Sequence, residues 1–430
     1  MAVDSLSGSS QLSKTLNILF LTHRVPHPPN RGDRIRSHHL LQFLSARADV
    51  HLGCLADEAL SGETLAWLNR HSARLAVEPL GTWSRWGRAA LSVMCGGSAT
   101  EGLYRSPRLK RTVRDWAREI EFDAVVVFCS SMWQYVDIPE LADVPIIVDL
   151  VDVDSQKWFD YAAGASGWRR WLYRLEGRRV QRLEGLIARR AKAITLVSEA
   201  EAELFRGVWP NDKTLGVPNG VDLEYFNPEA VEPTSENYDC IFVGQLDYHP
   251  NVEGVRWFCQ HVWPAIVRER PGATFAVVGR RPTAEVRKLT EQPGVKLIGE
   301  VPDVRPYLAA AKIAVAPLQI ARGIQNKVLE AMAMGLPVIA SPGALTGLPV
   351  ENDVEVIASS TPQEWINRTL QLCASESARQ QLGRAARDYV HRHHNWADCL
   401  SPFAESLAST TADSSANETR RPVYVGHGSR

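Results

Sequence analysis

Short apolar runs alternate with longer segments of helical periodicity over most of the chain. The runs that predict strands are 17–22, 50–55, 124–129, 146–150, 193–197, 240–243, 274–278, 296–298, 313–316 and 337–340. Because these runs are almost continuously apolar, we expect strands that are covered on both faces, as in parallel sheets. Segments with helical spacing separate them, for example 34–46, 108–120, 254–268 and 324–334. Repeated strand–helix alternation predicts an α/β protein with doubly wound sheets.

The alternation breaks between residues 216 and 238, a stretch that is rich in Pro, Asn and Gly and has no periodicity. A new strand pattern, CIFVG, follows at residue 240. We therefore expect two Rossmann-like domains, 17–215 and 216–390, whose sheets face each other across a ligand-binding cleft. The Ser-rich residues 1–16 and the tail 409–430 are expected to be disordered.

Length and composition agree with a globular protein of two domains. The chain has 430 residues, with 45% hydrophobic and 23% charged, which excludes collagen-like, coiled-coil and disordered classes. Lysine and arginine total 48 against 49 acidic residues, so the overall charge does not favour nucleic acid as a partner. Seven scattered cysteines without a CxxC pair favour reduced thiols. Without a long apolar run or a signal-peptide pattern, we expect a cytoplasmic protein.

The stretch ARGIQNKVLEAMAMGLPVIAS at 321–341 carries the strongest candidate chemistry. A predicted strand leads through a loop into a helix, and Gly323 in that loop lets backbone N–H groups approach a ligand closely. Arg322 and Lys327 add positive charge to the same helix end, which suits a diphosphate. Glu330, three residues after Lys327, is placed to accept hydrogen bonds from ribose hydroxyls. An ordinary strand–loop–helix with a capping glycine and surface charges explains the spacing equally well.

Four segments of the chain resemble family-4 glycosyltransferases, which have the two-domain GT-B fold, and a fifth adds to the likeness to one subgroup. They are GIQNKVLEAMAMGLPVIAS at 323–341, VPNGVDLEYFNP at 217–228, CIFVGQLDYHPNVEGVRWF at 240–258, NILFLTHRVPHPPNRGDRIRSHHL at 17–40 and IIVDLVDVDSQKW at 146–158. The last three are similar to the subgroup of sugar transferases that is associated with exosortase/PEP-CTERM exopolysaccharide systems. The resemblance covers nearly all of residues 17–407.

The resemblance implies a nucleotide-sugar donor in the second domain, an acceptor on the first, and a helix at 391–408 that returns to the first domain. It also implies retention of anomeric configuration and no metal or cofactor besides the nucleotide-sugar, because basic side chains and helix dipoles neutralise the leaving diphosphate. From the residues themselves, and not as a family rule, we expect Arg322, Lys327 and Asp152 to be the catalytic residues. The implied donor-binding residues are Gly244, Gln245, Gly323, Ile324, Glu330 and Gly32, and Arg31 and Asp33 lie on the acceptor side.

The chain departs from the family pattern around the diphosphate. Many members carry a glutamate eight residues before the helix glutamate, where this chain has Arg322. Many also carry an arginine and a lysine in the loop after the first strand of the second domain, where this chain has Gln245 and Asn251. We predict that Arg322 and Lys327 replace these missing cations.

Two loops of the first domain are candidates for its side of the cleft. Asn30-Arg31-Gly32-Asp33 precedes a helical pattern, and Gly32 there favours close approach of an anion or a sugar. Plain turn chemistry, with Asp33 as an N-cap, is the alternative. Asp152 and Asp154 superficially match the metal-binding D-x-D of another glycosyltransferase fold. We instead expect a strand-end loop that lines the cleft, in which Asp152 holds a sugar hydroxyl or acts as a base on the acceptor.

A basic and aromatic segment lies at 168–192. It contains nine lysines and arginines against two acids, Glu176 and Glu184, with Trp168, Trp171 and Tyr173 among them. Basic and aromatic residues on an amphipathic helix favour an anionic membrane surface, and the segment 83–95 is a candidate for the same surface. The alternatives are a solvated surface helix whose arginine stems cover core leucines, and RNA binding.

These features favour a retaining glycosyltransferase that moves a sugar from a nucleotide-sugar to a glycan or polyprenyl-linked acceptor in exopolysaccharide biosynthesis. A GT-B nucleotide-sugar epimerase is one alternative, and it would turn over the donor without an acceptor. The other is a sugar-nucleotide-binding scaffold in which the lost basic pair has abolished turnover.

Overall fold

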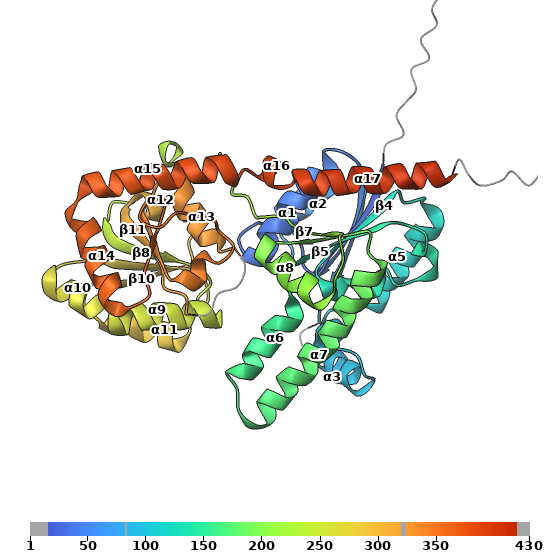
Figure 1. Ribbon diagram of the computed structural model, residues 1–430, viewed down its shortest axis with the longest axis horizontal. Coiled ribbons are helices and arrows are strands. Elements are labelled where there is room, and N and C mark those ends of the chain that lie inside the picture. Colours follow the sequence, from blue (N-terminus) through green and yellow to red (C-terminus); the bar gives the residue numbers. More distant parts are fainter. Residues whose placement is uncertain (1–15, 82–83, 320–323, 419–430) are drawn as a thin grey trace, which may run out of the picture.

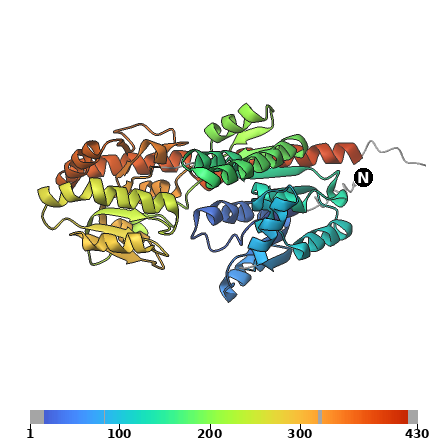
Figure 2. The same cartoon turned by 90° about the horizontal axis from the view of Figure 1, so that it is seen from below.

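The computed structural model describes residues 16–81, 84–319 and 324–418, and these form two parallel β-sheets flanked by helices (Figure 1). Within these residues, the first sheet has seven strands in the order β3-β2-β1-β4-β5-β6-β7. The second has six strands in the order β10-β9-β8-β11-β12-β13. The two sheets lie in separate lobes, as both views show (Figure 2). The predicted α/β class with doubly wound parallel sheets is confirmed.

The first lobe is built by residues 17–216. Its strands are β1 (Asn17–Thr22), β2 (Asp49–Ala56), β3 (Arg74–Pro79), β4 (Ala124–Phe128), β5 (Ile146–Val151), β6 (Ala193–Leu196) and β7 (Thr214–Gly216). Its α-helices are α1 (Gly32–Ser45), α2 (Gly62–Arg70), α3 (Ser84–Met94), α4 (Ala99–Leu103), α5 (Pro107–Glu119), α6 (Asp154–Ala163), α7 (Gly167–Arg190) and α8 (Glu199–Val208).

The second lobe begins with the strand that follows the predicted boundary region. Its strands are β8 (Tyr238–Val243), β9 (Phe275–Val278), β10 (Val295–Gly299), β11 (Ala311–Ala316), β12 (Val338–Ala340) and β13 (Ile357–Ala358). Its α-helices are α9 (His249–His261), α10 (Trp263–Glu269), α11 (Ala284–Lys288), α12 (Arg305–Ala309), α13 (Asn326–Ala333), α14 (Pro362–Ala374) and α15 (Glu376–His393), and the chain continues into α16 (Trp396–Cys399) and α17 (Ser401–Glu418).

Apolar residues on both faces of the central strands explain why helices cover the sheet on two sides. In β1, Leu19 and Leu21 belong to one buried cluster, whereas Ile18 and Phe20 belong to the cluster on the opposite face. β4 is buried at every position. A strand buried on both faces reads as a continuous apolar run, because neither side contacts water.

Three strands were absent from the expected set: β3, β7 and β13. β3 and β7 are the outermost strands of the first sheet, and β13 is an outermost strand of the second. β3 is only partly buried along its length, and β7 and β13 contain three and two residues. Short or half-covered edge strands lack the apolar run by which the central strands are predicted.

The C-terminal segment connects the two lobes. α15 lies along the second lobe, and after a break at Asn395 the chain continues over the first lobe as α16 and α17 (Figure 1, top). Trp396, Phe403 and Leu407 are buried in the core that contains β1 and α1. The predicted return of the C-terminal helix to the first domain is therefore confirmed.

α17 extends further than the predicted start of the disordered tail. The helix continues to Glu418, so the expectation of disorder from residue 409 is wrong for residues 409–418. The stretch STTADSSANE contains neither Gly nor Pro, so no residue in it breaks a helix. Within the described residues, no helix is both long and apolar enough to cross a membrane.

Candidate active site

Three neighbouring strands of the second sheet lead into loops at their C-terminal ends. β8 leads into Gly244 and Gln245, its neighbour β9 leads into Gly279 and Arg280, and a third loop, of which residues 320–323 are not described, joins β11 to α13. Parallel sheets bind ligands at this edge. Arg322 and Gly323, predicted in the third loop, lie outside the described residues.

The first two loops are in direct contact. Gly279 has a φ of +154°, and a Cβ atom placed on it would lie 1.7 Å from the carbonyl oxygen of Gly244. Only glycine permits this approach. Arg280 is anchored there as well, because its carbonyl oxygen accepts a hydrogen bond from the Leu246 N–H at 2.9 Å.

Lys327 lies on the first turn of α13 and reaches the β8 loop. Its Nζ donates to Oδ1 of Asn251 at 2.5 Å, and Nδ2 of Asn251 donates to the backbone oxygen of Gln245 at 2.8 Å. The ammonium also lies 5.0 Å from the centre of the Phe242 ring. Burial lowers the pKa of Lys327 to about 8, opposed in part by the charge of Glu330.

Glu330 follows one turn later on the same face of α13, because residues three apart are neighbours on a helix. Burial raises the pKa of its carboxyl to about 7, and the nearby Lys327 limits the rise. A lysine and a glutamate whose pKa values are both displaced towards neutrality, on one helix end in a concave site, form a typical functional pair.

The other predicted donor residues of this domain lie around the pair. Gln245 is directed to Asp247, since its Nε2 donates to Oδ1 of that residue at 2.5 Å. Ile324 is buried in the core of the second lobe. Asn326, at the start of α13, accepts a hydrogen bond from Nδ2 of Asn219 at 3.0 Å. Asn219 belongs to the segment that connects the lobes, so the start of α13 is tied to the first lobe.

That connection continues into a buried ion pair that the sequence did not reveal. Nη1 of Arg36 in α1 donates to Oδ1 of Asn219 at 3.0 Å and to the Val217 carbonyl oxygen at 2.8 Å. Nε of Arg36 donates to Oδ2 of Asp149 at 2.8 Å, and both side chains are 1% exposed or less. A buried charge needs partners of this kind. The linker and α13 are thus positioned by the first sheet.

On the first lobe, Gly32 opens α1 and is exposed, and Arg31 precedes it as the N-cap residue. Asp33 is therefore inside the helix, so its alternative role as N-cap is wrong; its side chain lies outside the described part of the chain. Nη1 of Arg31 lies 3.3 Å from Oδ2 of Asp57, which follows β2.

Asp57 is the centre of a cationic cluster, formed with Arg24, Arg31 and Arg34. Arg24 and Arg34 also pair with its carboxylate, the latter at 3.2 Å, and Arg34 contacts Glu58 at 2.5 Å. Burial alone would raise the pKa of Asp57, but the three guanidinium groups lower it below its usual value. The carboxylate of Asp57 thus holds three guanidinium groups together at this edge of the first lobe.

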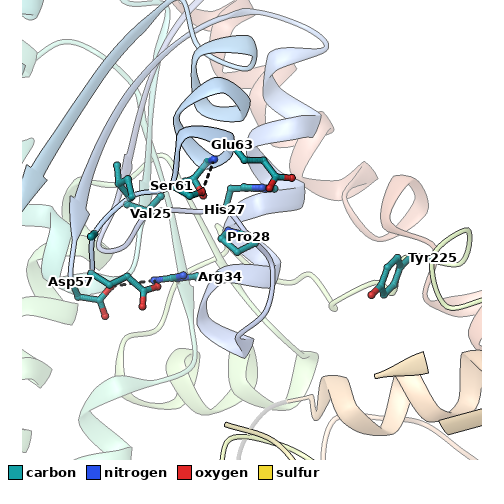
Figure 3. A pocket seen from close by; sticks show the side chains of 12 residues that line it. Val25, His27, Pro28, Arg34, Asp57, Ser61, Glu63 and Tyr225 are labelled. Atoms are coloured by element: carbon teal, nitrogen blue, oxygen red, sulfur yellow. Dashed lines mark hydrogen bonds and ion pairs between the residues drawn. The ribbon is translucent and has the colours of Figure 1, made fainter. Parts of the chain in front are cut away.

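A cavity of about 570 Å³ lies beside this cluster (Figure 3). The first lobe provides most of its wall, including His27, Pro28, Arg34 and Glu63, and Tyr225 of the linker faces them from the other side. Lys327 and Glu330 do not line it. The cavity is therefore separate from the lysine–glutamate pair.

Asp152 lies in the bend after β5. It belongs to an electrostatic group with Lys157 and Tyr161 of α6 and with Tyr248, the N-cap residue of α9 in the second lobe. Asp154 is held by Ser130, whose Oγ donates to its Oδ2 at 2.6 Å, and burial raises the pKa of Asp154. Asp152 thus faces the start of α9, one turn before Asn251.

The predicted residues therefore form three groups: the lysine–glutamate pair with the β8 loop, the Arg31 loop, and Asp152 opposite α9. Sequence reasoning missed Arg36, Asp57, Tyr248 and Arg280. The position of Arg280 two residues after a predicted strand was the one available signal, since strand-end loops carry function in these sheets.

Two glycosyltransferase families match the chain, one in each half. The Glycosyl transferase 4-like domain matches residues 95–220, and Glycosyl transferases group 1 matches residues 237–375. A curated relative is the glycosyltransferase 1 domain-containing protein 1 of Xenopus tropicalis, 27% identical over 135 residues. That alignment covers 30% of this chain and 39% of the relative. The chain thus spans well under two thirds of the relative's length.

Solved structures match the whole arrangement. Sucrose-phosphate synthase of Thermosynechococcus elongatus has a TM-score of 0.69 at 16% identity, over 93% of this chain and 100% of that one. HepE of Anabaena, in complex with UDP and glucose, has a TM-score of 0.64 at 17% identity, over 92% and 100%. The chain therefore has the GT-B fold, and a glycosyltransferase domain model matches each of its two halves.

Proposed function

We propose that the protein transfers a sugar from a nucleotide-sugar to a glycan or polyprenyl-linked acceptor, with retention of anomeric configuration. The observation that carries the proposal is the Lys327–Glu330 pair, held beside Gly244 at the start of α13 through Asn251. HepE of Anabaena, whose structure contains UDP and glucose, supports a nucleotide-sugar as the donor.

In this proposal, the diphosphate of the donor lies between the β8 loop and the N-terminus of α13. Lys327 and the helix dipole stabilise the negative charge that develops as the sugar–phosphate bond breaks. Arg322 and Gly323 act at the same helix end. Glu330 accepts hydrogen bonds from hydroxyl groups of the donor, and Gly32 borders the donor from the first lobe.

The acceptor occupies the first-lobe side of the cleft. The cavity beside Arg34 offers carboxylate, hydroxyl and imidazole groups together with Pro28, a mixture that suits a sugar. Arg31 and Asp33 border this region, and Asp152 serves the acceptor hydroxyl as a base or a hydrogen-bond acceptor. Neutralisation by side chains and backbone makes the reaction independent of a metal ion.

We further propose that the enzyme works on the inner face of the plasma membrane, in a PEP-CTERM-type exopolysaccharide system. The two acids of the basic segment face inward. Glu176 accepts hydrogen bonds from the N–H groups of Ala99 and Thr100 at 2.8 Å, and Glu184 accepts from Ser155. The exposed arginines of α7 are therefore left without these two acids as counter-charges.

Apolar residues accompany these charges. Trp168 and Trp171 of α7 are 71% and 66% exposed, and α3 exposes Trp86 and Met94. Nη1 of Arg179 donates to the Gly97 carbonyl oxygen at 2.8 Å, which fastens the turn after α3 to α7. The hairpin of α6 and α7 projects from the first lobe with α3 beside it (Figure 1). Exposed tryptophans among arginines suit the headgroup region of an anionic bilayer.

The test begins with a thermal-shift screen of UDP-, GDP- and ADP-sugars, since a ligand that binds the folded state raises its stability. The bound nucleotide-sugar is then incubated with polyprenyl-linked glycans, with and without EDTA, and the anomeric configuration of the product is read by NMR. Transfer with retention, unaffected by EDTA, is expected. Donor isomerised without an acceptor would indicate the epimerase, and binding without any turnover would indicate the scaffold.

A further inference from the structure

Arg280 is a cation at the cleft that forms no ion pair with the residues that the structure describes, and only the more distant Glu58 acts on its charge favourably. In the part of the chain that the structure describes, its Nε and Nη2 are buried and have no hydrogen-bond partner. Its backbone is fixed by Leu246 and by the contact of Gly279 with Gly244, so the guanidinium is held at the end of β9. A buried N–H donor of a charged group without an acceptor is costly.

The surroundings of Arg280 increase this cost. Burial lowers the pKa of its guanidinium, and repulsion from Arg31, Arg281 and Arg34 adds to the effect, with only Glu58 opposing it. Arg31 and Arg34 belong to the first lobe, where Asp57 and Glu58 already pair with them. Like charges gathered from two lobes indicate a place for a multivalent anion.

The position of Arg280 in the sheet indicates which anion it binds. β8 lies between β9 and β11 in the sheet, so Arg280 and Lys327 flank the β8 loop from its two sides. The family cations of that loop are replaced here by Gln245, which pairs with Asp247, and Asn251, which holds Lys327. One cation on each side of this loop, in which neutral residues stand at the two positions of the family cations, matches the two phosphates of one diphosphate.

We propose that Arg280 binds the diphosphate of the nucleotide-sugar from the β9 side, opposite Lys327. This inference rests on the proposed function, and it assigns to the chain a replacement cation in a different loop from the one in which the family carries it. The guanidinium gains acceptors for its buried N–H groups when the donor binds.

Arg281 provides a matched control. It is the next residue, carries the same charge, and is 59% exposed beside Asp247 at 3.9 Å. We compare the wild type, Arg280→Gln, Arg280→Lys and Arg281→Gln, using inorganic pyrophosphate as the probe so that no base or sugar needs to be known. Affinity is measured by calorimetry at low salt, and the unfolding midpoint is measured without ligand.

Arg280→Gln is expected to weaken pyrophosphate binding about tenfold, Arg280→Lys less, and Arg281→Gln by less than twofold. Without ligand, the midpoint of Arg280→Gln should equal or exceed that of the wild type, because an unsatisfied cation has been removed. Affinity within twofold of the wild type would overturn the proposal, as would an equal loss in Arg281→Gln or a wild type that does not bind pyrophosphate. A lower midpoint with unchanged affinity would make Arg280 a structural residue.

Sugar transfer by the wild type is measured separately. If the wild type transfers sugar but Arg280→Gln binds pyrophosphate normally, the inference about Arg280 fails and the proposed function stands.

Discussion

At the scale of single residues, the contact of Asn251 with Lys327 gives a reason for the departure from the family pattern. A lysine at position 251 would place a second ammonium against that of Lys327, whose Nζ lies 2.5 Å from the Asn251 oxygen. The neutral amide instead orients the ammonium towards the β8 loop. Asn251 therefore has two effects: it removes the family cation from its own position, and it holds Lys327 in place.

Glu330 supplies the first prediction. Glu330→Gln removes the charge from the acceptor of the proposed hydroxyl contacts, so we expect kcat/KM to fall roughly ten- to hundredfold, or about 1.5–3 kcal/mol. The unfolding midpoint should not fall, since burial already disfavours the ionised carboxyl. Steady-state kinetics and thermal unfolding measure the two effects, with the exposed Glu291→Gln as the control. Unchanged kinetics would remove Glu330 from the site.

The second prediction concerns pH and Lys327. With a pKa of about 8 in the free protein, the amine loses its proton above that pH, whereas a bound diphosphate requires the ammonium. Diphosphate affinity should therefore fall above about pH 8, approaching tenfold per pH unit. Calorimetry in buffers of different ionisation enthalpy should detect proton uptake near pH 8.

Lys327→Arg tests the assignment of that proton, because an arginine stays charged over this range. Its affinity profile should remain flat to about pH 9.5 even if the affinity itself is lower. The same fall in the variant as in the wild type would assign the titration to another group.

At the scale of elements, α13 and α7 differ in the burial of their charged side chains. α13 keeps Lys327 and Glu330 half-buried at the cleft, where low polarity changes their pKa values. α7 buries its glutamates against the N-terminal ends of α4 and α6 and exposes its arginines, including Arg170, Arg174 and Arg178. The same residue types thus serve a reaction site in one helix and a surface in the other.

The third prediction tests the α7 surface. Replacing Arg170, Arg174 and Arg178 by glutamine should reduce sedimentation with phosphatidylglycerol vesicles, because each cation near an anionic surface contributes about 1 kcal/mol. Binding should also weaken as salt rises from 0.1 to about 1 M, where the Debye length shrinks from about 10 to about 3 Å. Activity on a soluble acceptor should persist.

The control for this experiment removes three exposed cations of the second lobe, Arg287, Lys288 and Arg384. That variant should sediment like the wild type, and neutral vesicles should retain little of either protein. If the wild type does not bind anionic vesicles at low salt, α7 is only a solvated surface helix and the proposed membrane contact is wrong.

At the scale of the whole molecule, the C-terminal segment returns to the first lobe against a group of histidines. His39 of α1 stacks on Trp396 with ring centroids 4.4 Å apart, and the neighbouring His38 stacks on Trp67 at 4.3 Å. Burial lowers the pKa of His38 to about 3 and that of His39 to about 4. Both rings are therefore neutral in the folded protein at neutral pH.

The fourth prediction follows from these values. Between about pH 4 and 6.5 the unfolded chain binds protons at both histidines and the folded protein does not, so stability falls as the pH falls. Each group contributes a slope of roughly 1.4 kcal/mol per pH unit. Replacing His39 by Phe should remove about one proton from the slope of denaturant-unfolding free energy against pH. The exposed His261→Gln should leave it unchanged, and an unaltered slope in His39→Phe would contradict the assignment.

Several features of this protein were determined by the sequence alone, because they depend on neighbours in the chain. Continuous apolar runs predicted the central strands, and the break at 216–238 separated the strands of the two sheets. The motif at 323–341 placed Lys327 and Glu330 on one helix end, since positions three residues apart share a face.

The tertiary structure decided the contacts between distant segments. Lys327 and Asn251 are 76 residues apart, and Arg36 and Asp149 are 113 apart. The inward direction of Glu176 and the approach of Arg280 to Arg31 also depend on how separate elements pack. Local pattern indicates which side chains a strand end or helix face carries. The packing of elements across the whole fold decides which of these side chains meet. It also decides how far burial changes their pKa values.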